Sequence, residues 1–462
     1  MTTAEETKQL APWTNTVPKD WQVTRLDAAA DVLFSNVDKH TIEGEKPVRL
    51  CNYVDVYKND RITAGIGFME ASAEEREIRK FQIRRGDILA TKDSEEADDI
   101  AIPSLVAEEL PGVLCGYHLA MIRPRLVSVS GSYLAWLHAS KSFRAQYEAK
   151  AVGVTRFGLS QYAFRAARIP LPPLPEQQRI AAYLDASCAA IDAAVAAKRR
   201  QLETLDSLRK SAAHQVLSEG LRPGLPLNDS GIESIGVIPA HWDVKQIRYA
   251  CEVNYGITLQ LEKGQSVGDG VRILTVSNLT IDGNLDLEDE YYIDPALLTK
   301  ADYLRRGDLL FNWRNGSRYH VGKTAFFDME GEVAHVSFLL RIRCGRHMNP
   351  FFMRSYLGVL KDAGFFAGAK DKVNKTFNST ELKRLRVVIP PLDEQEEVCR
   401  EIERRNKECN DVKAAIEAQI ATLTAYRKSL IHECVTGQRR ITEAGLEKTQ
   451  HTEATPLNAH QY

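Results

Sequence analysis

The sequence predicts an α/β (α+β) fold in which two similar mixed α/β lobes are joined by two long antiparallel coiled-coil helices. Two observations predict it: short motifs return after 221 or 218 residues, and each copy of the last motif opens a long stretch with helical periodicity. The paired motifs are PKDWQV and PAHWDV, RRGDIL and RRGDLL, and LPPLPEQQ and IPPLDEQE. A chain repeated in this way is expected to present two similar surfaces related by a pseudo-twofold axis.

The positions of these motifs divide the 462 residues into six segments. Each of the two lobes is long enough to bury a core of its own, and a hydrophobic content of 44% is ordinary for a globular chain. The predicted segments are an N-terminal extension (1–17), a first lobe (18–170), a first spacer helix (171–222), a second lobe with its linker (223–388), a second spacer helix (389–438), and a polar tail (439–462) that we expect to be disordered.

The two spacer helices carry a narrow apolar register. Neither proline nor glycine interrupts the chain between Pro175 and Gly220 or between Pro391 and Gly437, and apolar residues recur there at steps of three and four. This register is typical of a coiled-coil seam, so the two rods are expected to pack together, each about 65 Å long. Ordinary bundle helices without a spacer role are the alternative. The predicted seam residues are Leu184, Ile191, Val195, Leu202, Leu205, Val398, Ile402, Val412, Ile416 and Leu423.

Each lobe has the pattern of many short strands joined by turns. The RGD sequence of each lobe is expected to form a turn before a buried strand, with Gly86 and Gly307 in a conformation that side chains resist. Positive charge collects late in each lobe: residues 300–390 carry 17 basic and 8 acidic side chains, and residues 141–170 carry six and one. A face that contacts phosphate needs such segregation, although the net charge of the chain is only −2.

Loops rich in glycine, asparagine, threonine and basic residues supply the candidate nucleic-acid-binding side chains. Lysine and arginine bind phosphate, and arginine and asparagine also pair with base edges in the major groove. An ordinary surface ion pair is the alternative for any single residue. The candidates are Lys150, Thr155 and Arg156 in the first lobe, and Arg314, Asn315, Ser317, Arg318, Lys370, Lys372, Asn374 and Lys375 in the second.

The sequence predicts no catalytic residue, no metal site and no cofactor held by this chain. Residues 349–352 (NPFF) resemble the Asn-Pro-Pro-Phe pattern of DNA adenine methyltransferases, but the third position differs and no glycine-rich strand-to-helix loop precedes them. Asn349 is better interpreted as a helix N-cap with Pro350 at the first helical position. No GxxxxGK[ST] loop is present, and eight cysteines without a CxxC pair indicate neither a zinc site nor a disulfide framework.

One family shares this combination of motifs. Residues 18–440 resemble the specificity subunit of a type I restriction-modification system, through the twofold Pro-Pro-Leu-x-Glu-Gln opening, the two RGD lobes, and the segment LRKSAAHQVLSEG with its counterpart YRKSLIHECVTG. The resemblance implies that the lobes are target-recognition domains, each reading one half of an asymmetric bipartite DNA site, with the helices as a ruler between them. It further implies two methyltransferase (modification) subunits docked on the helices and a restriction/translocase subunit when present. S-adenosylmethionine, ATP and Mg are then expected on those partners.

The sequence also predicts a cellular location, and it leaves one alternative function class open. The N-terminus MTTAEETKQL is polar and acidic, and no uncharged run of about 18 apolar residues occurs, so we expect a cytoplasmic chain without a membrane partner. A coiled-coil interaction adaptor that never binds DNA is the competing class, because the near-neutral net charge permits it. The bases read and the spacer length depend on loop geometry and DNA shape, which the sequence does not predict.

Overall fold

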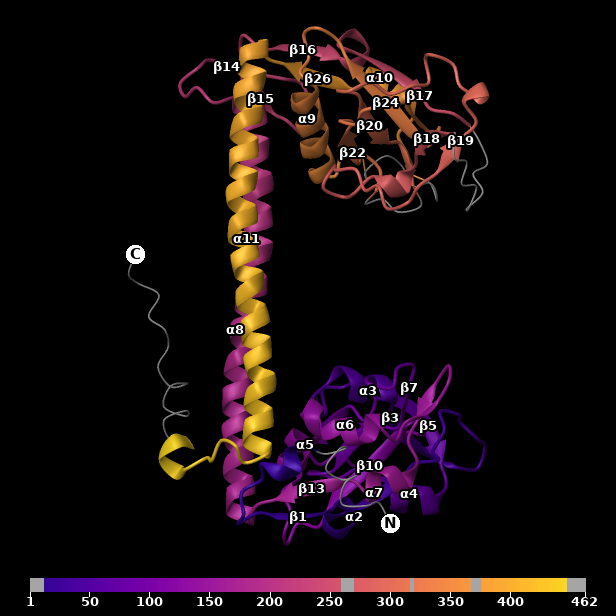
Figure 1. The fold of residues 1–462 in the computed structure, drawn as a ribbon, viewed down its shortest axis with the longest axis vertical. Helices are drawn as coiled ribbons and strands as arrows, with labels where there is room; N and C mark the ends of the chain where they lie inside the picture. Colours follow the sequence, from indigo (N-terminus) through magenta and orange to yellow (C-terminus); the bar gives the residue numbers. More distant parts are fainter. Residues whose placement is uncertain (1–11, 259–269, 316–319, 367–374, 447–462) are drawn as a thin grey trace. The chain divides into compact units, whose positions relative to one another are not determined.

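The computed structural model describes residues 12–258, 270–315, 320–366 and 375–446 (Figure 1). Its contacts divide the chain into two compact units: unit 1 combines residues 1–199 with 417–462, and unit 2 spans residues 200–416. Each unit therefore holds one lobe and one end of each long helix. We call the part of unit 1 that precedes the first long helix lobe 1, and the part of unit 2 between the two long helices lobe 2.

Lobe 1 is built from thirteen strands and short helices. Its strands are β1 (Gln22–Arg25), β2 (Ala30–Phe34), β3 (Lys46–Cys51), β4 (Arg61–Ile62), β5 (Met69–Ala73), β6 (Ile88–Thr91), β7 (Asp93–Ser94), β8 (Pro103–Val106), β9 (Val113–Cys115), β10 (Leu119–Pro124), β11 (Val152–Gly153), β12 (Phe157–Gly158) and β13 (Arg168–Leu171). Its helices are η1 (Pro12–Asn15), α2 (Leu26–Ala29), α3 (Tyr53–Lys58), α4 (Glu75–Phe81), α5 (Gly131–Ala139), α6 (Lys141–Glu148) and α7 (Gln161–Arg165).

Lobe 2 repeats this plan. Its strands are β14 (Leu227–Asp229), β15 (Val237–Pro239), β16 (Asp243–Gln246), β17 (Cys251–Tyr255), β18 (Val271–Leu274), β19 (Tyr292–Ile293), β20 (Leu309–Asn312), β21 (Arg314–Asn315), β22 (Thr324–Phe326), β23 (Val333–His335), β24 (Leu339–Cys344), β25 (Lys375–Thr376) and β26 (Arg386–Ile389). Its helices are η2 (Ile247–Tyr249), η3 (Val276–Asn278), η4 (Pro295–Leu297), α9 (Pro350–Asp362) and α10 (Ser379–Arg384).

The strand order shows the internal repeat directly. The sheet β2-β10-β6-β8 of lobe 1, which β4 extends, has its counterpart in β17-β24-β20-β22 of lobe 2. The sheet β5-β3-β9 matches β19-β18-β23, and in both the last pair is parallel while the first is antiparallel. The pairs β1-β13 and β16-β26 also correspond. The predicted fold of two similar mixed α/β lobes is confirmed.

The central strands β6 and β20 explain why the RGD motif returns. Both strands are buried along their whole length, and the preceding Gly86 and Gly307 have φ angles of 90° and 93°, as predicted. The aspartate of each motif accepts the backbone N–H of the first turn residue and binds an arginine on the neighbouring strand with both carboxylate oxygens. Asp87 pairs in this way with Arg123, and Asp308 with Arg343.

The two long helices, α8 (Leu174–Glu219) and α11 (Leu392–Val435), pack antiparallel (Figure 1). In unit 1 the start of α8 shares a core with the end of α11, whereas in unit 2 the end of α8 packs on the start of α11. Figure 1 shows them side by side, which confirms the predicted pairing. The residues that form these contacts are Leu184, Cys188, Ile191, Leu430 and Cys434 in unit 1, and Ala213, Val216, Leu217, Val398 and Ile402 in unit 2.

Burial along the predicted seam is uneven. Leu184, Ile191, Val398 and Ile402 are buried, and Val195, Leu202, Leu205, Ile416 and Leu423 are partly buried. Val412 is 48% exposed, so it does not lie in a closed seam. By length and composition alone, α8 is apolar enough to cross a membrane, but Asp185 and Asp192 within it bind arginines of unit 1. We interpret α8 as a coiled-coil helix on these contacts.

The repeated Pro-Pro-Leu-x-Glu-Gln motif joins each helix to its lobe. The buried Glu176 accepts the indole N–H of Trp21, and Glu394 accepts that of Trp242, so the first and last paired motifs of each lobe touch. The next residue, Gln177 or Gln395, is fully buried and bonds backbone groups at the start of α5 or α9 as well as the proline carbonyl before the helix. The motif is therefore a structural junction.

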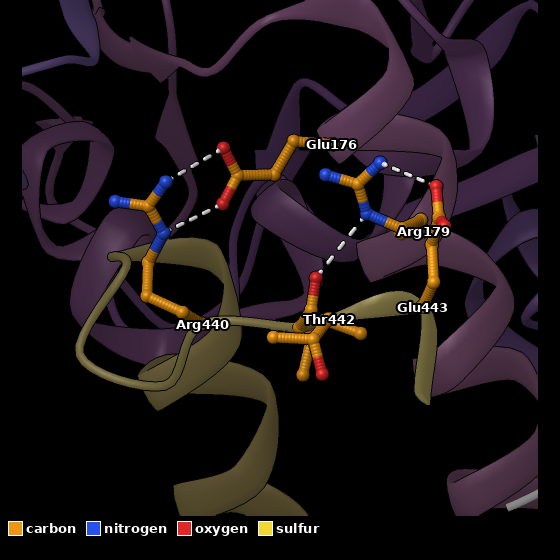
Figure 2. Close-up of a pocket in the computed structure, with 6 residues that line it drawn as sticks. Glu176, Arg179, Arg440, Thr442 and Glu443 are labelled. Atoms are coloured by element: carbon orange, nitrogen blue, oxygen red, sulfur yellow. Dashed lines mark hydrogen bonds and ion pairs between the residues drawn. The ribbon is translucent and has the colours of Figure 1, made fainter. Parts of the chain in front are cut away.

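The chain beyond α11 folds back onto unit 1. Arg440 binds Glu176 and Asp20, and Arg179 donates to the carbonyl of Ile441, which is buried in the core of lobe 1. Figure 2 shows Glu176, Arg179 and Arg440 with Thr442 and Glu443 around an open cleft, which has a volume of about 470 Å³. Of the predicted polar tail, Arg440 and Ile441 thus pack on unit 1, whereas residues 442–444 are exposed.

Candidate nucleic-acid interface

Two segments that lie far apart in sequence meet at one edge of lobe 1. The short strand β7 continues from the central strand β6 and pairs with β12, which belongs to the β11–β12 hairpin. A Cβ atom on Gly153 would lie 1.9 Å from the carbonyl oxygen of Arg156, so glycine allows the tight hairpin there. The tip of the hairpin is open to solvent, with Val152, Val154, Thr155 and Arg156 all exposed.

Asp93 on β7 organises the polar groups of this edge. One carboxylate oxygen accepts the Nη2 group of Arg156, and the other lies 2.7 Å from Nδ1 of His118. The hydrogen bond that Arg156 donates to Asp93 raises the pKa of Arg156. The Asp93 side chain is 15% exposed and Arg156 is 57% exposed, so the carboxylate is held beneath an arginine that faces solvent.

A lysine lies between aromatic rings beside this cluster. The Lys92 Nζ atom is 4.3 Å from the centre of the Tyr117 ring and 5.1 Å from that of Phe34, both cation–π distances. Burial lowers the pKa of Lys92, and Asp93 opposes that shift. Tyr117 remains 49% exposed, and it therefore presents a ring face or edge to any bound partner.

Lobe 2 has the same backbone arrangement at this edge, which we call the frame, but it carries different side chains. Strand β21 follows the central strand β20 and pairs with β25. The backbone carbonyl of Trp313 accepts the N–H of Phe377, just as the carbonyl of Lys92 accepts the N–H of Leu159 in lobe 1. Trp313 packs edge-on against Tyr255 and donates to the carbonyl of Ser337. The guanidinium of Arg314 lies 5.7 Å from the ring centre of Phe338, which is 45% exposed.

The two edges therefore differ in charge at equivalent positions. The residue that follows the lysine or tryptophan is Asp93 in lobe 1 and Arg314 in lobe 2, at the sequence offset of 221 that also relates the two RGD motifs. The exposed aromatic residues Tyr117 and Phe338 share this offset. One frame thus presents two different chemical surfaces.

Residues 18–204 match the family model described as "Type I restriction modification DNA specificity domain". Over these residues the chain is similar to the specificity subunits of type I restriction-modification systems. The match covers lobe 1 and the greater part of α8, and the sequence resemblance on the repeated motifs is confirmed.

Relatives match the chain over both halves. The chain is 22% identical over 438 residues to the putative type I restriction enzyme MjaX specificity subunit of Methanocaldococcus jannaschii, covering 92% of this chain and 95% of the relative. It is also 22% identical over 335 residues to the EcoKI specificity subunit of Escherichia coli K12, covering 71% and 68%.

Solved structures support the fold at low sequence identity. A chain from work on complex assembly and conformational transition of the type I R-M system has a TM-score of 0.70 at 18% identity, covering 91% of this chain and 98% of that one. The HsdS subunit of Thermoanaerobacter tengcongensis has a TM-score of 0.54 at 18% identity, covering 92% and 98%.

The structure locates six of the predicted nucleic-acid contacts. Thr155 and Arg156 lie on the exposed hairpin, and Lys150 is half-buried just before it, where burial lowers its pKa. Arg314 is exposed on β21, and the strand pairing brings Asn315 opposite Lys375. The remaining candidates, Ser317, Arg318, Lys370, Lys372 and Asn374, lie outside the described residues.

Sequence reasoning missed the residues that surround these candidates. Lys92, Asp93, Tyr117 and His118 of lobe 1 stand in ordinary-looking strand and turn sequences. The repeat offset was the signal that could have found them, because Phe34 aligns with Tyr255 and Tyr117 with Phe338. Within the described ranges, no group of three or more histidine, cysteine or carboxylate side chains could hold a metal ion.

Proposed function

We propose that this specificity subunit reads an asymmetric bipartite DNA site, one half with each lobe, and directs adenine methylation and restriction by partner subunits. In this proposal the chain itself is not catalytic. The partners are double-stranded DNA, two methyltransferase subunits bound to the helical region, and a restriction/translocase subunit when present. S-adenosylmethionine, ATP and Mg belong to those partners, and the assembly works in the cytoplasm.

The single observation that carries the proposal is the repeated frame with unlike side chains. Equal frames suit two similar segments of duplex, whereas Asp93 in lobe 1 against Arg314 in lobe 2 makes the two readers select different bases. Family membership supports sequence-specific DNA recognition as the activity of the whole chain.

Exchange of one lobe tests the independence of the two readers. Replacing residues 18–170 by the corresponding lobe of another specificity subunit should change one half of the methylated site and leave the other half unchanged. Sequencing of methylated adenines in cells that carry the exchanged protein and both partner subunits measures this. A change in both halves would contradict the proposal.

The two long helices are proposed to set the spacing between the half-sites. At about 1.5 Å rise per residue, removal of one heptad from each helix shortens it by roughly 10 Å, or about three base pairs of B-DNA. We expect the number of unread base pairs to fall while both half-sites stay the same. An unchanged spacer, determined from the same methylation maps, would disprove the ruler.

The adaptor without DNA binding remains the second function class, because the net charge of the chain is −2. Binding of the complex to duplex DNA should fall steeply as salt rises if phosphates are contacted, since each neutralised phosphate releases counterions. Absence of measurable binding of the complex to duplex DNA, even at low salt, would favour the adaptor.

A further inference from the structure

We infer that Arg156, held by Asp93, reads a guanine in the half-site of lobe 1. The inference rests on the proposed function and assigns one base contact within it. Arg156 acts on the base, and Asp93 is a positioning residue that acts through Arg156.

The geometry leaves the recognition edge of Arg156 open. Asp93 engages only Nη2, and His118 Nδ1 lies 3.5 Å from the same group. No other described residue supplies an acceptor to Nε or Nη1, and the side chain is 57% exposed. Guanine presents two acceptors, O6 and N7, on its major-groove edge, and the planar guanidinium matches them with two parallel N–H groups.

The support beneath Arg156 is rigid. Asp93 lies in a two-residue strand that pairs with β12. Two backbone hydrogen bonds flank it: the N–H of Leu159 donates to the carbonyl of Lys92 at 2.8 Å, and the N–H of Lys92 donates to the carbonyl of His118 at 3.2 Å. The hairpin that carries Arg156 is the tight one that requires Gly153. A side chain held at both ends in this way loses little conformational entropy when it binds.

Local charge favours a base over a phosphate as the partner. Asp93 and Glu95 both raise the pKa of Arg156, and Glu95 is exposed. A phosphate that approached Arg156 would meet these carboxylates, whereas the edge of a guanine is neutral. The guanidinium therefore keeps its directional donors while its attraction for phosphate is reduced.

The test uses the complete complex with its methyltransferase partners and a duplex library randomised at the half-site of lobe 1. In Arg156→Lys the positive charge stays and the paired donors are lost. We expect the preference for one G·C pair, about 10- to 100-fold in the parent, to disappear at that position only, with the salt dependence unchanged. Asp93→Asn should weaken the same preference and steepen the salt dependence, because the freed arginine then binds phosphate. Asp93→Glu, which keeps the carboxylate, should retain more of the preference for the G·C pair than Asp93→Asn does.

Arg125→Lys is the matched control. Arg125 is an exposed arginine of lobe 1 that also binds a carboxylate, Asp31. It follows the end of β10, whereas His118 precedes the start of that strand. It should leave every base preference unchanged. A uniform loss of affinity in Arg156→Lys with all preferences kept would make Arg156 a phosphate contact and overturn the inference. Unchanged binding would overturn it too, while the lobe exchange still decides the proposed function separately.

Discussion

Asp308→Ala is expected to destabilise lobe 2 by about 3–5 kcal/mol, because it leaves a largely buried arginine without its partner. Asp308 is 1% exposed, and its two oxygens bind Arg343 at 2.7 and 2.6 Å while one also accepts the N–H of Arg305 at 2.7 Å. The substitution removes a charge pair and the bond that closes the turn before β20. Hydrogen exchange resolved by peptide measures the loss, since it reports the stability of each lobe separately.

The effect should stay within one lobe. Asp87→Ala, the equivalent change at the Arg123 pair, should lower protection in lobe 1 and leave lobe 2 unchanged. Asp243→Asn is the control for loss of an exposed ion pair, with Lys245, and should cost less than about 1 kcal/mol. Equal losses in Asp243→Asn and Asp308→Ala would show that burial of the pair is not the cause.

Acid is expected to destabilise lobe 2 through His335. The ring is 1% exposed, and burial followed by the charge of Arg341 lowers its pKa to about 4. Between pH 6.5 and 4 the unfolded chain binds a proton that the folded lobe excludes, so stability falls as pH falls through this range and is constant above it. From pH 7 to pH 5 this residue alone should cost about 2 kcal/mol.

His335→Cys isolates this contribution from that of the carboxylates. Cysteine is the residue of lobe 1, Cys115, on the corresponding parallel strand, so the change fits the fold. The difference in unfolding free energy between parent and variant should grow by about 2 kcal/mol in favour of the variant from pH 7 to pH 5. His40→Gln, at a residue 73% exposed, is the control and should leave the slope unchanged. Parallel pH profiles for parent and His335→Cys would contradict the prediction.

Much of the fold could be predicted from local signals. The PPL-x-EQ motifs mark both helix starts, because proline excludes helix before them, and Gly220 and Gly437, with φ angles of 73° and 76°, end the rods. The interpretation of Asn349 as an N-cap is confirmed, since its side chain accepts from Phe351 and Phe352. The packing of Arg440 and Ile441 could not be read in this way, because it depends on partners more than 260 residues distant.

The candidate site was predictable only in part. Charge and loop composition pointed to Arg156 and Arg314, because side chains that bind phosphate or bases leave a compositional trace. The roles of Asp93 and Tyr117 have no such trace, since a carboxylate that holds an arginine looks in sequence like any surface acid.

By itself, the sequence determined the duplication, the paired rods and the resemblance to a family, because repeats and helical periodicity are written in consecutive residues. Only the tertiary structure decided that β7 meets β12 and β21 meets β25. Strand pairing joins segments about 60 residues apart through backbone hydrogen bonds, which carry no side-chain signature, and the identity of each reading edge follows from that pairing.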